Sequence, residues 1–298
     1  MNAAFRLEFI TPLFSRGAYE DQPEVRPASI RGQLHWWFRT LGGKYHDEKA
    51  IFGGVHNGAS ASKLVVRVGI VLGQTGEIAT LPHKTGGKTS PKACYLPGTT
   101  FELHVLSRLG GLRSDHEAPF QRTLEAWLLL GTLGLRATRA GGSFCWKPLR
   151  ETTLRYPSDW NEFEQRCALV LRRSLLKFAL LDEIYANSDA ARHIISDTLG
   201  GPDQADELDD LRNLHWPLGD VASKRQQRAD PTRKDRKTSP LRFRIVKIGN
   251  QFRIAALWDA RDEVTHNNTR TDLLGIIRLL EERKPALGQQ LAASALAR

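Results

Sequence analysis

The chain has 298 residues, of which 41% are hydrophobic and 26% are charged, a composition typical of a globular protein with about two domains. No apolar run reaches the roughly 18 residues that a membrane-spanning helix needs. Arg6 and Glu8 interrupt the only early apolar stretch, so no signal peptide is expected. The net charge of +10 favours nucleic acid or another polyanion as the partner.

The cysteines indicate a reducing compartment. Cys94, Cys145 and Cys167 are odd in number and widely spaced, which argues against a disulfide framework and predicts a cytoplasmic protein. Neither a CxxC motif nor a histidine pair with helical ligand spacing occurs. We therefore expect no structural zinc, no other metal and no cofactor.

Hydrophobic periodicity predicts an α+β domain over residues 1–150. The expected elements are a strand at 3–10, a helix at 29–41 capped by Ser29, a central strand at 64–72, a strand at 99–106, a helix opening at Pro119 and a strand at 144–149. Residues 73–97 are expected to form a long loop. The order β-α-β-β-α-β is that of a ferredoxin-like fold.

Residues 151–298 form a second predicted domain, which is richer in helix. Helices are expected at 159–185, 189–199 and 272–284, and Gly249-Asn250 predicts a tight hairpin between strands at 242–248 and 251–258. An acidic patch covers 203–210. Residues 221–240 carry many basic and few apolar side chains, which predicts a mobile basic loop. This loop is either a solvated insertion or an arm that orders on RNA.

Arg31, His35 and Arg39 are four residues apart in the first predicted helix, so they form one polar ridge with Trp36 nearby. Cationic groups in line beside an aromatic ring suit the phosphates and bases of a nucleic acid. The same spacing also describes the solvent face of an amphipathic helix. Helical geometry alone favours this second interpretation.

A glycine-rich stretch at 131–143 is the second candidate. Glycines let a backbone approach a phosphate closely and expose its N–H groups, and arginines add charge-assisted contacts. The stretch lacks the ending of a Walker loop and follows a helix rather than a strand, so it is no dinucleotide fingerprint. Its candidate residues are Gly131, Gly134, Gly141, Gly142, Arg136 and Arg139.

Several motifs together resemble the RAMP superfamily, the repeat-associated proteins of CRISPR systems, and within it the first-subunit family of type III-B (Cmr) effector complexes. They span most of residues 5–145, and a hairpin start at Ser239-Pro240-Leu241 also fits. The motifs are Thr11-Pro12-Leu13-Phe14, residues 23–32, Trp36-Trp37-Phe38-Arg39, Ile51-Phe52-Gly53, residues 96–101 and the stretch 131–143. Ala140 and Gly142 stand where the family has another basic or aromatic residue.

The resemblance implies two ferredoxin-like RAMP modules, the second one divergent. It also implies a non-catalytic subunit that lies near the 3′ end of the guide RNA, helps to engage target RNA and binds other subunits. The RNA contacts it favours are Arg26, Arg31, His35, Arg39, Lys84, Lys88, Lys92, Arg136 and Arg139.

Two alternatives stay open at this point. Some RAMP relatives process guide RNA with a histidine general base, and His35 or His46 would fill that role in a metal-independent endoribonuclease. The other alternative is a structural adaptor that docks neighbouring subunits. We expect no catalytic residue in the leading interpretation.

Overall fold

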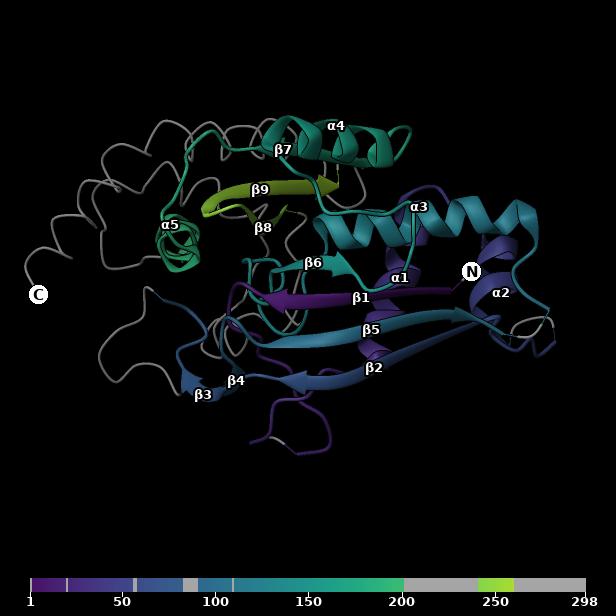
Figure 1. Cartoon of the computed structure of the whole chain (residues 1–298), viewed down its shortest axis with the longest axis horizontal. Helices are drawn as coiled ribbons and strands as arrows, with labels where there is room; N and C mark the ends of the chain where they lie inside the picture. Colours follow the sequence, from purple (N-terminus) through teal and green to yellow (C-terminus); the bar gives the residue numbers. More distant parts are fainter. Residues whose placement is uncertain are drawn as a thin grey trace, which may run out of the picture.

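The computed structural model describes residues 2–19, 21–55, 58–82, 91–108, 110–200 and 241–259, with only the backbone described at 197–200. Figure 1 shows two main antiparallel sheets, one from each half of the chain. A two-stranded hairpin of β3 (Thr75–Ile78) and β4 (Lys92–Tyr95) lies apart from both. The protein is therefore of the α+β class, as the sequence predicts.

The first sheet has the strand order β2-β5-β1-β6, with every neighbouring pair antiparallel. Along the chain, α1 lies between β1 and β2, and α3 lies between β5 and β6. Each β-α-β unit thus has a strand of the other unit between its own two strands, the split arrangement of a ferredoxin-like module. The elements are β1 (Asn2–Phe9), α1 (Pro27–Thr40), β2 (Leu64–Leu72), β5 (Thr100–Ser107), α3 (Ser114–Leu130) and β6 (Phe144–Pro148).

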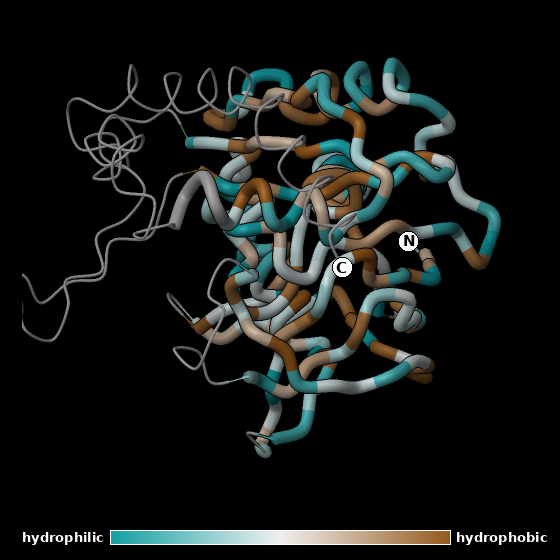
Figure 2. Tube along the Cα trace, turned by 90° about the vertical axis from the view of Figure 1, so that its left-hand side faces the viewer, coloured by the Kyte–Doolittle hydropathy of each residue, from teal (hydrophilic) through white to brown (hydrophobic). Residues whose placement is uncertain are grey.

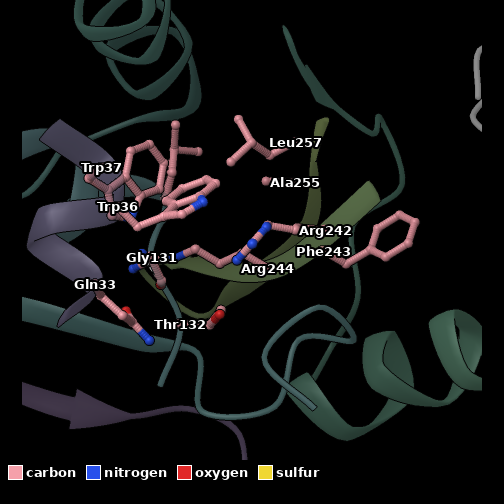
Figure 3. Close-up of a pocket in the computed structure, with 11 residues that line it drawn as sticks. Gln33, Trp36, Trp37, Gly131, Thr132, Arg242, Phe243, Arg244, Ala255 and Leu257 are labelled. Atoms are coloured by element: carbon pink, nitrogen blue, oxygen red, sulfur yellow. Dashed lines mark hydrogen bonds between the residues drawn. The ribbon is translucent and has the colours of Figure 1, made fainter. Parts of the chain in front are cut away.

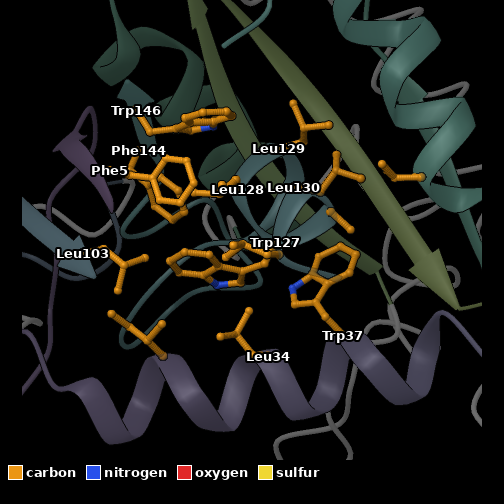
Figure 4. Packing of buried hydrophobic residues seen from close by; sticks show 14 of the residues in the cluster. Phe5, Leu34, Trp37, Leu103, Trp127, Leu128, Leu129, Leu130, Phe144 and Trp146 are labelled. Atoms are coloured by element: carbon orange, nitrogen blue, oxygen red, sulfur yellow. The ribbon is translucent and has the colours of Figure 1, made fainter. Parts of the chain in front are cut away.

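The core lies between this sheet and the helices α1 and α3. Phe5, Leu7 and Phe9 alternate along β1 and are fully buried, because alternate strand residues share one face. Figure 4 shows Trp127 of α3 between the strands and Leu34 of α1. Burial of each such side chain contributes about 1.5–3 kcal/mol.

The second sheet has the order β7-β9-β8 and follows α4. Its elements run β-α-β-β, with the third strand between the other two, which repeats the arrangement of β1, α1, β2 and β5. The described part therefore matches three strands of a ferredoxin-like module. The elements are α4 (Trp160–Leu171), β7 (Leu176–Leu180), α5 (Ser188–Gly200), β8 (Leu241–Ile248) and β9 (Gln251–Asp259).

One hydrophobic cluster extends through both halves. It joins Trp127 and Phe144 of the first module to Leu176 of β7, Val246 of β8 and Leu257 of β9. In Figure 2, hydrophobic and hydrophilic residues alternate along the elements, as expected when each element has one buried face.

Several expectations about the elements are wrong. The helix expected at 159–185 ends at Leu171, and residues 176–180 instead form β7, which pairs with β9. β2 lies at the sheet edge rather than its centre. Pro119 lies inside α3, which begins at Ser114, and α1 begins at Pro27 rather than behind a Ser29 cap.

The sequence analysis did not predict two short features. The helix α2 (Tyr45–Phe52) was not expected, and the expected loop at 73–97 contains β3 and β4. The hairpin around Gly249-Asn250 is confirmed, and the three cysteines are free thiols. The acidic patch at 203–210, the basic loop at 221–240 and the helix at 272–284 lie outside the described residues.

Candidate functional site

The basic ridge of α1 packs against α2. Arg31 donates a hydrogen bond to the carbonyl of Phe52. His35 Nδ1 lies 2.7 Å from Glu48 Oε1, and Arg39 Nε donates to Glu48 Oε2 at 2.7 Å. The His35 ring also lies against Phe52, with 4.1 Å between ring centroids. These three side chains therefore hold α2 in place, and the Arg39 side chain stays 64% exposed.

Glu48 is the acceptor that organises this ridge. Burial acts to raise the pKa of its carboxyl, but the hydrogen bonds from Arg39 and His35 outweigh that effect and hold the pKa below its usual value. The carboxylate is charged at neutral pH. It compensates much of the positive charge that the sequence analysis assigned to RNA contact.

The glycine-rich stretch is a compact loop that joins distant segments. Gly134 and Gly142 have φ angles of +77° and +63°, and a Cβ on either would lie within 2.5 Å of a backbone oxygen. Most of its N–H groups donate within the chain, so those groups are not free to bind phosphate. The bonded N–H groups belong to Gly131, Leu133, Leu135, Arg139, Ala140, Gly141, Gly142 and Ser143.

The loop also places Arg136 and Arg139 beside β8. Ala140 N–H donates to the Phe243 carbonyl at 3.2 Å, and Phe243 N–H donates to the Thr138 carbonyl at 3.1 Å. Arg136 is exposed, with a φ of +59°. Burial and the nearby charge of Arg136 lower the pKa of Arg139 to about 10, so Arg139 is still charged at neutral pH.

A pocket lies where α1, the loop and the second sheet meet (Figure 3). The Arg242 guanidinium lies over the Trp36 ring, 4.2 Å from its centroid. Arg244 is 2% exposed and donates to the carbonyls of Gly131, at 2.6 Å, and Phe144. The lining residues are Gln33, Trp36, Trp37, Leu130, Gly131, Thr132, Arg242, Phe243, Arg244, Ala255 and Leu257.

Arg244 is charged although it is buried. Burial lowers the pKa of its guanidinium to about 10, and the ring of Phe144 lies 4.5 Å from the guanidinium carbon. Its hydrogen bonds join β8 to Gly131 at the start of the loop and to Phe144 just after the loop ends. Its Nε–H has no hydrogen-bond partner among the residues that the structure describes.

The predicted site residues therefore fall into separate groups. Arg31, His35 and Arg39 face α2, whereas Arg136 and Arg139 lie beside β8. Arg26 is exposed at the start of α1, and Lys92 is half-buried in β4. Lys84 and Lys88 lie outside the described residues.

The sequence analysis missed the arginines of β8. Arg242 and Arg244 are two residues apart on a strand and share a face, a signal that the sequence itself contains. The contact of Arg242 with Trp36 joins the two halves of the chain. Within the described ranges no group of three or more metal-ligating side chains occurs, and no described helix has the length and apolarity to span a membrane.

Comparisons with known proteins identify the family. The RAMP superfamily model matches residues 6–145. The Cmr subunit Cmr1-2 of Pyrococcus furiosus is 32% identical over 187 residues, which cover 51% of this chain and 98% of that protein. The subunit Cmr1-1 of the same organism is 29% identical over 148 residues, which cover 41% of this chain and 40% of that protein.

Solved structures share the fold. The crystal structure of apo Cmr1 from Pyrococcus furiosus has a TM-score of 0.54 at 20% identity, over 87% of both chains. A chain of the type III-B Cmr-beta complex bound to cognate target RNA, solved by cryo-EM, has a TM-score of 0.57 at 12% identity, over 93% of this chain and 99% of that one. The split β-α-β sheet, the family match and the near-complete coverage of Cmr1-2 lead to one conclusion: the chain belongs to the Cmr1 family of the RAMP superfamily.

Proposed function

We propose that this protein is the non-catalytic RNA-binding subunit of a type III-B (Cmr) CRISPR effector complex, placed near the 3′ end of the guide RNA and aiding the engagement of target RNA. Its partners are then guide (crRNA) and target RNA together with other Cmr subunits. Similarity to Cmr1-2 over 98% of that protein and to a chain of a complex bound to target RNA supports this proposal.

The observation that carries the proposal is the junction of the two modules. The loop brings Arg136 and Arg139 to β8, and Arg242 of β8 lies over Trp36 of α1. Among the described residues that line the pocket at this junction there is no carboxylate, and the charge that acts on Arg242 is that of Asp259 of β9. Positive charge beside aromatic rings is what proteins use to hold single-stranded nucleic acid.

Binding in this arrangement follows charge and shape. Guanidinium groups that reach a phosphate backbone position the nucleic acid without reading its sequence. We therefore expect similar affinities for single strands of different sequence, and a strong dependence on salt.

The contacts of the histidines favour the non-catalytic role over the endoribonuclease. His35 is held between Glu48 and Phe52, and His46 pairs with Asp47 at 2.8 Å. A general base for RNA cleavage must reach a 2′-hydroxyl instead.

The test measures RNA binding by the purified chain over a range of salt concentrations, with cleavage followed in the same samples in EDTA. Arg26→Gln and Arg136→Gln are combined, because both side chains are exposed. Removing one cation that meets a phosphate lowers the slope of log affinity against log salt by about 0.7, so the double variant is expected to have a slope smaller by about 1.4.

The matched control combines Arg155→Gln and Lys177→Gln, which remove the same charge from exposed positions away from the junction. It should keep the wild-type slope. Equal slopes in both double variants would remove Arg26 and Arg136 from the interface, and metal-independent cleavage would favour the endoribonuclease.

A further inference from the structure

We propose that the outer edge of β2 binds an extended, acidic segment of a neighbouring protein subunit, which adds a strand to the first sheet. This inference rests on the proposed function, in which other Cmr subunits are partners, and it names the surface that one of them covers. β2 is the edge strand of the order β2-β5-β1-β6 (Figure 1), and among the described residues it pairs with β5 alone.

The first argument is the composition of β2. Its sequence, LVVRVGIVL, contains one charged residue, one glycine and seven aliphatic residues. Near-continuous aliphatic runs are typical of strands that have neighbours on both sides, which is why the sequence predicts a central strand. A long apolar edge is also a template for another strand, whose main chain supplies the hydrogen bonds. A strand added by a partner would give β2 the central position that its composition fits.

The second argument is a β-bulge that turns apolar side chains outward. The register of β2 against β5 shifts between Val68 and Val71. Both of these valines pack against the core cluster, so the residues on either side of Val71 point to the opposite face of the sheet. They are Ile70 and Leu72, which are 73% and 64% exposed. The bulge thus places two large apolar side chains in solvent beside the edge, as expected of a surface that a partner covers.

The third argument is the charge along this edge, which selects the partner. Arg67 of β2 is exposed, and so are Lys63 and Arg108 at the start of the strand, where the Arg108 N–H donates to the Lys63 carbonyl at 2.8 Å. Within the described ranges none of the three forms an ion pair. Opposite charges on neighbouring strands attract, and like charges repel. A second copy would bring a second Arg67 to the same sheet, whereas an acidic segment would pair with this one.

The first experiment compares hydrogen exchange in β2 between the free full-length chain and the complex assembled with the other subunits of the same type III-B system. In the free chain, the β2 amides that point away from β5 should exchange fast, because they face solvent. In the complex they should exchange more slowly by about tenfold or more. The internal reference is β6, the opposite edge strand, because Arg244 of β8 already bonds its Phe144 carbonyl; its exchange should stay the same.

The second experiment measures the affinity of variants for the assembly of the remaining subunits. Arg67→Glu should lower it about tenfold, because two negative groups would then face each other. Ile70→Thr keeps a β-branched residue but removes apolar surface, and should lower it about fivefold. The matched controls are Lys177→Glu, at an exposed position of the edge strand β7 in the second sheet, and Ile184→Thr, at a side chain that is 49% exposed outside the first sheet. Both controls should bind as the wild type does.

The outcomes separate the two proposals. If the chain assembles but β2 exchanges as fast as in the free chain, or if variants and controls lose affinity alike, the edge proposal is refuted and the proposed function stands. Protection already present in the free chain would assign the edge to the chain itself, or to a second copy if it grows with concentration. Protection by RNA alone would assign the edge to RNA, and each of these results overturns the edge proposal. If the chain joins no complex, the proposed function fails and the edge proposal with it.

Discussion

Glu48 is a buried carboxylate that His35 and Arg39 of α1 share. Its exposed fraction is 3%, and its oxygens accept from His35 and Arg39. Because these bonds favour the charged form, they lower the pKa of Glu48 in the folded state. The unfolded chain then binds a proton more readily than the folded one, so this residue links stability to pH.

Glu48→Gln is expected to reduce the acid sensitivity of folding. The stability that Glu48 contributes is complete above its unfolded pKa of about 4.3 and is lost as the pH falls through the lower folded value. Between about pH 5 and pH 3, the free energy of unfolding of the wild type should fall more steeply than that of the variant. Urea titrations at several pH values measure this difference.

Glu102→Gln is the control for this prediction. Glu102 pairs with Arg6 at 3.1 Å on the surface, where its side chain is 35% exposed, and such pairs contribute little. Its pH profile should match the wild type. A Glu48→Gln profile parallel to the wild type would contradict the role assigned to Glu48.

At the scale of the elements, two left-handed glycines differ only in their surroundings. Gly142 in the glycine-rich loop and Gly249 in the β8–β9 turn have φ angles of +63° and +59°. A Cβ on Gly142 would lie 2.1 Å from the Leu133 carbonyl oxygen, whereas a Cβ on Gly249 would meet no atom of the described residues within 4 Å. The first glycine is required by backbone angle and space, the second by angle alone.

Gly142→Ala should therefore destabilise the protein more than Gly249→Ala. The backbone angle alone costs about 1–2 kcal/mol, and we expect this loss for Gly249→Ala. Gly142→Ala adds a backbone clash that only movement of the loop can relieve, and we expect a loss larger by about 2 kcal/mol or more. Thermal and urea unfolding of the two variants measure the difference, and equal losses would contradict the close packing of this loop.

The elements also show which features the sequence encodes locally. The Gly249-Asn250 turn and the alternation of Phe5, Leu7 and Phe9 depend on neighbouring residues, and both predictions are confirmed. Residues 176–180 have helical spacing but form β7, because β9 pairs with them from about 80 residues downstream. Arg173 interrupts the helix, with a φ of +62°.

In the candidate site, too, the sequence predicts what depends on neighbouring residues but not what depends on contacts between distant segments. The sequence places Arg31, His35 and Arg39 on one face of α1, and the structure agrees. The sequence does not show that Glu48 covers this face, because α2 has only eight residues and its hydrophobic periodicity is weak. Nor does it bring Arg242 to Trp36, because that contact joins the two halves of the chain.

At the scale of the whole molecule, the boundary predicted near residue 150 falls between β6 and α4. It separates the two sheets, but not the hydrophobic core. Leu176 and Val246 of the second sheet share a cluster with Phe5 and Trp127 of the first module. Because these side chains belong to one cluster, we expect the described core to unfold as one cooperative unit.

Leu176→Ala tests this expectation. Leu176 is 4% exposed, and truncation of a buried leucine costs about 2–5 kcal/mol. In native-state hydrogen exchange, the most protected amides of β1 and β5 should lose as much protection as those of β7 and β9, since global unfolding sets exchange in all four. Leu169→Ala is the control, because Leu169 lies on α4 and is 65% exposed; protection should stay at the wild-type level in both sheets. Loss of protection confined to β7 and β9 would show two modules that unfold independently, and the pocket between them would then open without global unfolding.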